Sequence, residues 1–183
     1  SKEKALQLCN FTPDKPVDMF VGGSLGAKSI NSAISKNLDA LLTKYQVIHI
    51  CGKGQGNKIR QHGYKQFEFV DTEFKDLMAL ADVVVSRSGS NAIFELLSQK
   101  KPMLLVPLPS TSSRGEQSLN AQSFKEQGFA DILADKDVEN GLLTAIDTVY
   151  AKRNDYIEAM SKAEWKSTSN QQLFAEITNE QNI

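Results

Sequence analysis

The feature that most constrains this chain is a repeating alternation of short apolar runs with longer stretches of helical periodicity. The apolar runs are 17–21, 46–50, 67–70, 83–85, 103–106 and 130–133. Helices are predicted at 3–11, 30–45, 74–80, 92–97, 117–127, 138–149, 156–165 and 171–177. Continuous apolar strands separated by helices are typical of a parallel sheet covered on both faces. We therefore predict an α/β, Rossmann-like fold in which ligands bind at the carboxyl ends of the strands.

The composition excludes several other classes of protein. Of the 183 residues, 40% are hydrophobic and 23% are charged, as in a soluble globular domain. No apolar stretch approaches the roughly 18 residues of a membrane span, and the N-terminal segment lacks the apolar core of a signal peptide. The 21 basic and 22 acidic residues give a net charge of −1, so no nucleic-acid partner is predicted. Cys9 and Cys51 cannot build a disulfide scaffold, which indicates reduced thiols in a cytoplasmic protein.

A glycine-rich turn, Gly22-Gly23-Ser24-Leu25-Gly26, follows the first apolar run and opens a predicted helix. Glycines let the backbone approach a ligand closely, and the N–H groups of a helix N-terminus attract phosphate. The turn differs from the G-x-G-x-x-G dinucleotide motif. It fits a phosphate contact and a ligand-free strand–helix turn equally well.

A second turn of this kind, Ser86-Arg87-Ser88-Gly89-Ser90, follows the fourth apolar run. Ser88 or Ser90 is predicted to cap the next helix, which would place Ser88, Asn91 and Glu95 on one stripe. A carboxylate there can accept two hydrogen bonds from the vicinal diol of a ribose. The alternative is a solvated surface glutamate.

The third candidate is the long polar segment from Leu108 to Ala121, which leads into a helix. Long loops at strand carboxyl ends often carry function. Glu116, Gln117 and Asn120 are suited to hydrogen-bonding sugar hydroxyls, and the alternative is a mobile surface loop.

Several other motifs are not expected to carry chemistry. Gly52-Lys53-Gly54 lacks the Walker spacing, and Asp135-Lys136-Asp137 matches D-x-D but precedes an amphipathic helix, which favours a helix start. His49 alternates with apolar residues and is interpreted as structural, and His62 has no evident partner. The scattered histidines and cysteines predict no metal site. No tightly bound cofactor is predicted, and Mg²⁺ is compatible with the pattern although no motif requires it.

Taken together, these motifs resemble the C-terminal, donor-binding domain of the MurG family, the N-acetylglucosaminyltransferases of peptidoglycan lipid synthesis. The resemblance covers the chain from the glycine turn to about Tyr150. It rests on the order and spacing of Gly22–Ala27, His49–Gly54, Ala81–Gly89, Glu95, Pro107 and Gln117–Ala121.

The resemblance implies that the chain is one half of a two-domain GT-B glycosyltransferase. Residues 1–16 would be the remnant of an inter-domain connection, 17–165 the UDP-sugar domain, and 166–183 a linker and helix that cross back to the missing domain. That N-terminal domain would bind the lipid I acceptor, supply the catalytic base and mediate peripheral membrane association. The full enzyme would convert lipid I to lipid II at the cytoplasmic face of the plasma membrane, serving cell wall biogenesis, cell shape and division. The isolated chain is predicted to be inactive.

The resemblance also implies a site for UDP-N-acetylglucosamine, with no catalytic residue in this chain. Val70 would offer backbone groups to the uracil, and Glu95 would hold the ribose. Ser24 would face the diphosphate together with N–H groups of the next helix start, and Gln117 and Asn120 would contact the sugar. The implied binding residues are Gly23, Ser24, Val70, Ser88, Gly89, Ser90, Asn91, Ala92, Glu95, Gln117 and Asn120. Glu116 stands where the family often has an amide, which leaves its role open.

Two other functions remain open from the sequence. A UDP-N-acetylglucosamine 2-epimerase shares the architecture and the donor, but the chain offers no convincing set of carboxylates and histidines for proton transfer. A non-catalytic nucleotide-sugar-binding module is the second alternative. The missing G-x-G-x-x-G motif disfavours a nicotinamide dehydrogenase.

Overall fold

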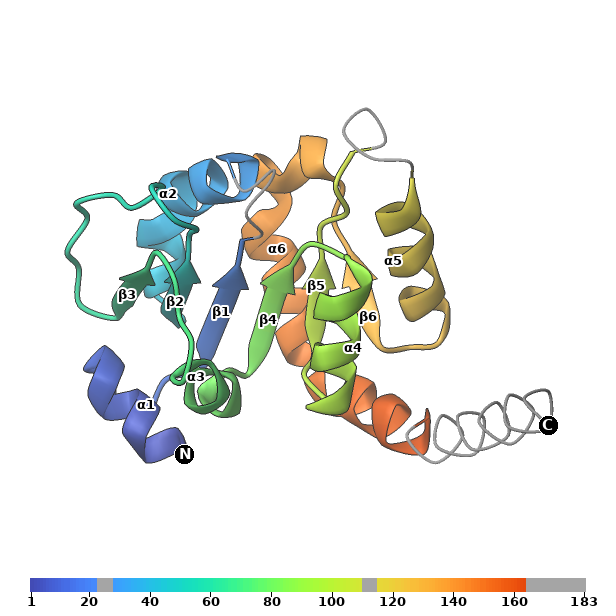
Figure 1. The fold of residues 1–183 in the computed structure, drawn as a ribbon, viewed down its shortest axis with the longest axis horizontal. Coiled ribbons are helices and arrows are strands. Elements are labelled where there is room, and N and C mark those ends of the chain that lie inside the picture. Colours follow the sequence, from blue (N-terminus) through green and yellow to red (C-terminus); the bar gives the residue numbers. More distant parts are fainter. Residues whose placement is uncertain (23–27, 110–114, 164–183) are drawn as a thin grey trace, which may run out of the picture.

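The computed structural model describes residues 1–22, 28–109 and 115–163, and its centre is a six-stranded sheet in which all paired strands run parallel (Figure 1). The strands are β1 (Val17–Val21), β2 (Gln46–Ile50), β3 (Tyr64–Phe67), β4 (Val83–Ser86), β5 (Met103–Leu105) and β6 (Ala130–Ile132). Their order, β3-β2-β1-β4-β5-β6, is the Rossmann order, and it reverses direction between β1 and β4. The crevice at this reversal is where such sheets bind ligands.

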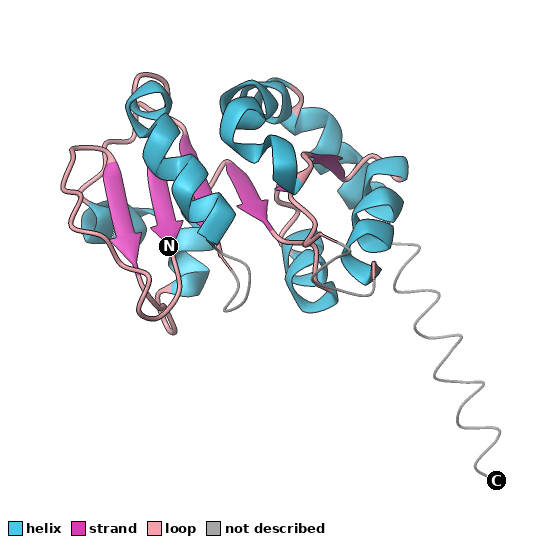
Figure 2. Cartoon of the chain, turned by 90° about the horizontal axis from the view of Figure 1, so that it is seen from above, coloured by secondary structure: helices cyan, strands magenta, loops and turns pink. Residues whose placement is uncertain are grey.

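Helices cover both faces of the sheet (Figures 1 and 2). They are α1 (Lys2–Cys9), α2 (Lys28–Leu42), α3 (Phe74–Leu80), α4 (Ser90–Ser98), α5 (Glu116–Glu126), the 3₁₀ turn η1 (Asp135–Asp137) and α6 (Val138–Ala151). In Figure 1, α3 and α4 lie in front of the sheet and α6 lies behind it, where it packs against α2. Residues 153–163 are also helical. No helix among these described residues is long and apolar enough to cross a membrane.

The core forms where the apolar strands meet the apolar faces of the helices. Phe20, Ile48 and Leu104, from β1, β2 and β5, are fully buried. Helix α2 buries Ile30, Ala33, Ile34, Leu38 and Leu41, at intervals of three and four residues. This spacing places them on one face, which explains why the segment forms a helix against the sheet. The N-terminal helix α1 joins the same core through Ala5 and Cys9.

One strand differs from its predicted position. The apolar run 67–70 predicts a strand, whereas β3 occupies Tyr64–Phe67. In the observed register Tyr64 pairs with Val47 and Phe67 pairs with Ile50, the last residue of β2. Phe69 and Val70 therefore lie beyond the end of the neighbouring strand and have no ladder partner, although their side chains are apolar. The strand position follows the available partners rather than the hydrophobicity.

The predicted helices agree with the observed ones within a few residues wherever the chain is described. The helix at 156–165 corresponds to the observed helical residues 153–163. Trp165, the helix at 171–177, and the glycine turn with Gly23 and Ser24 lie outside the described residues.

Candidate nucleotide-sugar site

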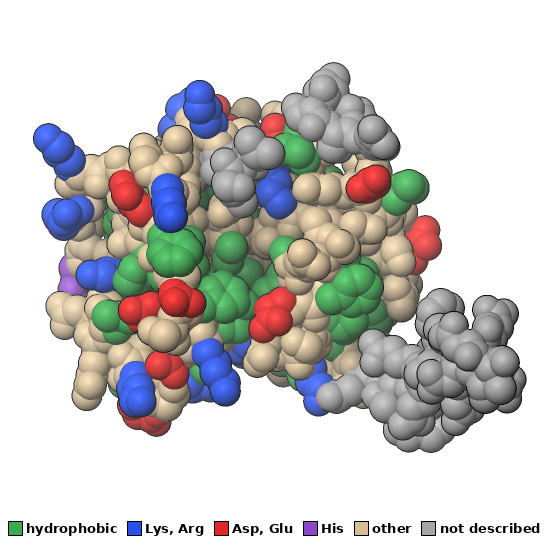
Figure 3. Space-filling view, in the orientation of Figure 1, with side chains coloured by type: hydrophobic (Ala, Val, Ile, Leu, Met, Phe, Trp, Pro, Cys, Tyr) green, Lys and Arg blue, Asp and Glu red, His purple; other side chains and the backbone are tan. Residues whose placement is uncertain are grey.

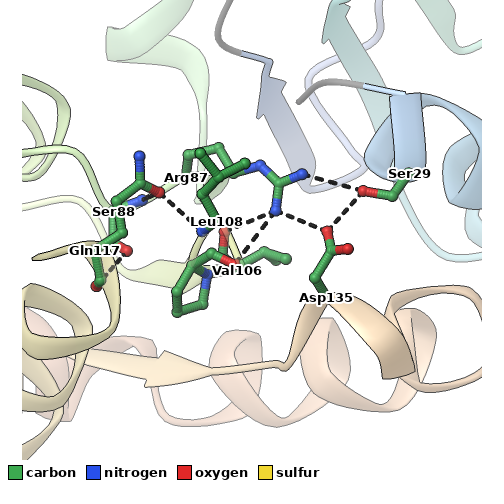
Figure 4. Close-up of polar contacts among 8 residues, drawn as sticks. Ser29, Arg87, Ser88, Val106, Leu108, Gln117 and Asp135 are labelled. Atoms are coloured by element: carbon green, nitrogen blue, oxygen red, sulfur yellow. Dashed lines mark hydrogen bonds and ion pairs between the residues drawn. The ribbon is translucent and has the colours of Figure 1, made fainter. Parts of the chain in front are cut away.

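The candidate site lies at the carboxyl edge of the sheet, where a buried arginine connects several strand ends (Figure 4). The Arg87 side chain, directly after β4, is 8% exposed. Its Nη1 donates to the carbonyl of Val106 (3.2 Å) and to Asp135 Oδ1 (2.7 Å). Its Nη2 donates to Ser29 Oγ (3.1 Å), and that hydroxyl donates in turn to Asp135 Oδ1 (2.6 Å). This network joins the start of α2 to the ends of β4 and β5 and to η1.

The D-x-D segment takes part in this network. Residues 135–137 form η1, and Asp137 is the N-cap of α6, so the predicted helix start is confirmed. Asp135 has an additional role that the sequence does not indicate, because it neutralises a buried guanidinium 48 residues away. Among the described residues, no group of three or more His, Cys, Asp or Glu side chains could hold a metal ion.

Beside Arg87, the predicted site residues Ser88, Gln117 and Asn120 are brought together. Ser88 Oγ donates to the main-chain carbonyl of Gln117 (2.7 Å), and Asn120 Nδ2 donates to the Ser88 carbonyl (3.0 Å). Gln117 Oε1 accepts from the backbone N–H groups of Leu108 (2.9 Å) and Ser88 (3.3 Å). The first turns of α5 are thereby attached to the loop before α4, although the two segments are about 30 residues apart.

Among the described residues, no side chain caps the N-terminus of α4. Its N-cap is Gly89, in an extended conformation, so the prediction that Ser88 or Ser90 caps the helix is wrong. The Ser88 hydroxyl is used by Gln117, and Ser88 lies before the helix rather than on its stripe. The first-turn N–H groups of Ser90, Asn91 and Ala92 have no acceptors within the helix. They are therefore suited to contact an anion.

Glu95 lies on the exposed surface of α4, one turn after Asn91. Its carboxylate has no hydrogen bond or ion pair with any other described residue. Its backbone carbonyl accepts from the Ser98 hydroxyl and from the backbone N–H of Gln99. The neighbouring Phe94 packs edge-on against Phe124, with ring centroids 5.8 Å apart. The Glu95 carboxylate is accordingly available to a ligand above α4.

A cavity of about 470 Å³ lies on the other side of the switch point, at the carboxyl ends of β1 and β2. It is lined by Val21, Gly22, Ile50, Gly52, Lys53, Gln55, Glu68, Phe69, Val70 and Phe74. The Phe69 side chain is 62% exposed and has Lys53 Nζ 5.0 Å from its ring centroid. Figure 3 shows hydrophobic side chains exposed on this face of the molecule, with acidic and basic side chains around them. Val70 therefore lines an apolar recess of a size suited to a planar ring.

His49 has a structural role, as its strand position predicts. Its ring is 1% exposed, with Nδ1 2.8 Å from the Tyr64 hydroxyl and Nε2 2.7 Å from Asn31 Oδ1. Burial lowers the pKa of His49 to about 4. The neutral ring thus links β2 to β3 and to α2. His62 is exposed, and Glu116 is exposed in the first turn of α5.

The parallel sheet of this order defines a Rossmann-like domain of the α/β class. Domains of this class typically bind nucleotides at the switch point, where this chain has a helix start and a recess on either side. Residues 19–177 match the model of the glycosyltransferase family 28 C-terminal domain. The chain belongs to this family.

The curated relatives carry a more specific name. A protein of Geobacillus thermodenitrificans, named UDP-N-acetylglucosamine–N-acetylmuramyl-(pentapeptide) pyrophosphoryl-undecaprenol N-acetylglucosamine transferase, is 48% identical over 89% of this chain and 47% of its own length. A Clostridium botulinum protein of the same name is 46% identical over 89% of this chain and 47% of its own length. The chain thus spans about half the length of the relatives it matches. They confirm the resemblance to the MurG family.

Solved structures agree on the fold. Acinetobacter baumannii MurG superposes with a TM-score of 0.68 at 22% identity, covering 85% of this chain and 48% of that one. The glycosyltransferase VinC in complex with dTDP superposes with a TM-score of 0.66 at 16% identity, covering 85% of this chain and 38% of that one. The predicted fold, a Rossmann-like sheet of the kind that forms one half of a GT-B glycosyltransferase, is confirmed.

Proposed function

We propose that this chain is the donor-binding half of an inverting N-acetylglucosaminyltransferase that converts lipid I to lipid II in peptidoglycan synthesis. The observation that carries the proposal is the uncapped N-terminus of α4 beside the joined side chains of Ser88, Gln117 and Asn120. This arrangement offers N–H donors for a diphosphate next to polar groups for a sugar. The names of the relatives at nearly half identity contain UDP-N-acetylglucosamine, which supports this nucleotide sugar as the donor.

The proposed contacts to the donor lie on both sides of the switch point. The uracil enters the recess lined by Val70, whose backbone groups bind the base edge, and Glu95 accepts hydrogen bonds from the ribose hydroxyls. The diphosphate faces the first-turn N–H groups of α4 and the turn that contains Gly23 and Ser24. Gln117 and Asn120 contact the N-acetylglucosamine.

In the reaction, this half makes UDP a better leaving group. Negative charge develops on the β-phosphate as the bond to the anomeric carbon breaks, and helix N-termini stabilise it without a protein-bound metal. The acceptor hydroxyl attacks the opposite face of the sugar and inverts the anomeric centre. Its base and the lipid I site belong to an N-terminal domain, which also brings the enzyme to the cytoplasmic face of the membrane.

The sharpest test of the donor site is the substitution Glu95→Ala. A hydrogen bond to a charged group contributes about 1.5–3 kcal/mol, so UDP binding should weaken by roughly 10- to 150-fold in calorimetric titration. The matched control is Glu3→Ala, which removes an exposed helical glutamate from α1, at the opposite edge of the sheet. Equal UDP affinity in Glu95→Ala and the wild type would show that Glu95 does not contact UDP.

The proposal that sugar transfer requires an additional N-terminal domain is tested separately. Transfer requires the donor, the acceptor and the base in one geometry, so the purified chain should bind UDP-N-acetylglucosamine but transfer no radiolabelled sugar to lipid I. It should also release no 2-epimer, which distinguishes it from an epimerase. Robust transfer by this chain alone would refute the two-domain proposal.

A further inference from the structure

Arg87 and Asp135 form an ion pair that the proposed donor contacts do not include. Arg87 lies between the two regions proposed to face the diphosphate. It immediately precedes Ser88 and the N-terminus of α4, and its Nη2 donates to Ser29 in the first turn of α2. One side chain therefore connects the beginnings of two helices that flank the switch point (Figure 4).

The cost of burying this arginine indicates a role beyond stability. Removing a guanidinium from water costs several kcal/mol, and an apolar pair of similar volume is often equally stable. Here the cost is offset by Asp135 at 2.7 Å and by the carbonyls of Val106 and Pro107, at 3.2 and 3.4 Å. An apolar pair, however, cannot replace the planar guanidinium, whose several N–H donors point in fixed directions.

The geometry links four chain segments at one edge of the sheet. Ser29 lies in the first turn of α2, and Arg87 follows β4. Val106 and Pro107 follow β5, and Asp135 lies between β6 and α6. Asp135 Oδ1 accepts from both Ser29 and Arg87, so the two donors are held relative to one carboxylate. A shift of the guanidinium would move the start of α2 relative to the loop that leads into α4.

We propose that Arg87 and Asp135 are positioning residues that set the spacing between the N-termini of α2 and α4, and thereby select a nucleoside diphosphate. This inference rests on the proposed function, because it assumes that both helix starts face the diphosphate. The pair acts at the starts of the two helices, whereas the proposed uridine contacts lie in the Val70 recess and at Glu95, one turn after Asn91. Replacing Arg87 or Asp135 should therefore weaken the binding of UDP, which carries the diphosphate, and leave the binding of uridine nearly unchanged.

The experiment measures the dissociation constants of UDP and uridine for the whole chain, by calorimetry for UDP and by NMR titration for uridine. In Arg87→Met, UDP affinity should fall by at least roughly tenfold, because small displacements of preorganised groups are costly, while uridine affinity stays within about twofold. Asp135→Asn retains the shape of the side chain and should show the same selective loss to a smaller extent. It provides the test if Arg87→Met fails to fold, which circular dichroism will reveal.

The matched control is Lys36→Met. Lys36 pairs with Glu139 at 2.6 Å and so connects α2 to α6, but on the exposed surface and away from the strand ends. This variant should leave both affinities unchanged. Chelator should not reproduce the effect of Asp135→Asn, because Asp135 is proposed to hold Arg87 rather than a metal.

The outcomes separate this inference from the proposed function. If the wild type binds no UDP, the proposed function fails. If the wild type binds UDP but the variants have the same ratio of UDP affinity to uridine affinity as the wild type, the pair is merely structural and the inference is overturned. This includes the case in which both affinities fall by the same factor. If chelator abolishes UDP binding only when Asp135 is present, the carboxylate holds a metal and the inference is also overturned.

Discussion

Ser88 and Gln117 are joined by two parallel hydrogen bonds, because Ser88 donates from its hydroxyl to the Gln117 main-chain carbonyl and from its backbone N–H to Gln117 Oε1. Leu108 donates a second backbone N–H to the same Oε1. The amide oxygen of Gln117 is thus occupied by two donors, which fixes the orientation of the amide. Its NH₂ group lies beside Gly89, so in the proposed site Gln117 would serve a ligand as a hydrogen-bond donor.

This arrangement predicts the effect of Gln117→Glu. A glutamate retains the acceptor for Ser88 and Leu108 but replaces the NH₂ donor by a negative charge beside the proposed sugar. The free energy of unfolding should change little, whereas affinity for UDP-N-acetylglucosamine should fall by roughly 5- to 20-fold. Calorimetry with the UDP-sugar and with UDP measures the effect, which should be smaller for UDP. A loss for UDP as large as that for the UDP-sugar would contradict a sugar contact.

The exposed ring of Phe69 at the recess predicts a loss of base binding on truncation. Stacking of a base on an aromatic side chain contributes about 1–3 kcal/mol, so Phe69→Ala should weaken uridine binding by roughly 5- to 150-fold. The matched control is Phe94→Ala, since Phe94 is 59% exposed but packs against Phe124 instead. Equal losses in the two variants would place the base elsewhere.

The buried ring of His49 predicts a loss of stability in acid. Its pKa is about 4 in the folded chain and about 6.5 when unfolded, so the unfolded state binds more protons between these values. The free energy of unfolding should therefore fall by roughly 3 kcal/mol as the pH drops through this window.

Urea unfolding at several pH values checks this prediction with a pair of variants. His49→Gln should remove most of the slope between pH 6.5 and 4, because the amide does not titrate. His62→Gln, at an exposed position, should retain the wild-type slope. An unchanged slope in His49→Gln would assign the acid sensitivity to another group.

Asp18 predicts a pH dependence of the opposite sign. Its carboxyl lies in β1, fully buried, and neither oxygen has a hydrogen-bond partner among the described residues. Burial, followed by the nearby charges of Asp82 and Asp147, raises the pKa of Asp18 well above its usual value. The unfolded carboxyl releases its proton first as the pH rises, so Asp18 makes the chain progressively less stable between its unfolded and folded pKa values.

The variant Asp18→Asn should therefore match the wild type near pH 4 and exceed it at pH 7 by roughly 1–3 kcal/mol. Asp39→Asn, which removes an exposed aspartate from α2, should show no such divergence. Urea unfolding at both pH values makes the comparison. If Asp18→Asn were destabilised at pH 7, the carboxyl would have a partner that stabilises its charge.

Much of the fold could be predicted from local patterns. Buried strands such as β1 and β4 are continuous apolar runs, and α2 places its apolar residues at helical spacing. These periodicities arise from the geometry of each element, so they are present in the sequence before any tertiary contact forms. The glycine and serine turns after the strands likewise indicated the edge of the sheet at which the donor site is proposed.

Positions that depend on a distant partner could not be predicted in this way. β3 lies three residues before its predicted start because β2 ends at Ile50. The N-cap position of α4 is Gly89, and the hydroxyl of Ser88, the predicted cap, donates to Gln117 instead. In both cases the local signal was present but a long-range contact decided the outcome.

By itself, the sequence determined the parallel α/β architecture and the family resemblance, and it indicated the edge of the sheet at which the site is proposed. Only the tertiary structure decided that Arg87 pairs with Asp135 and that the buried Asp18 carboxyl has no hydrogen-bond partner among the described residues. An isolated D-x-D or S-R-S segment contains no information about which strand ends become neighbours. That choice follows from the order of the strands in the sheet, which brings side chains 48 residues apart to within hydrogen-bonding distance.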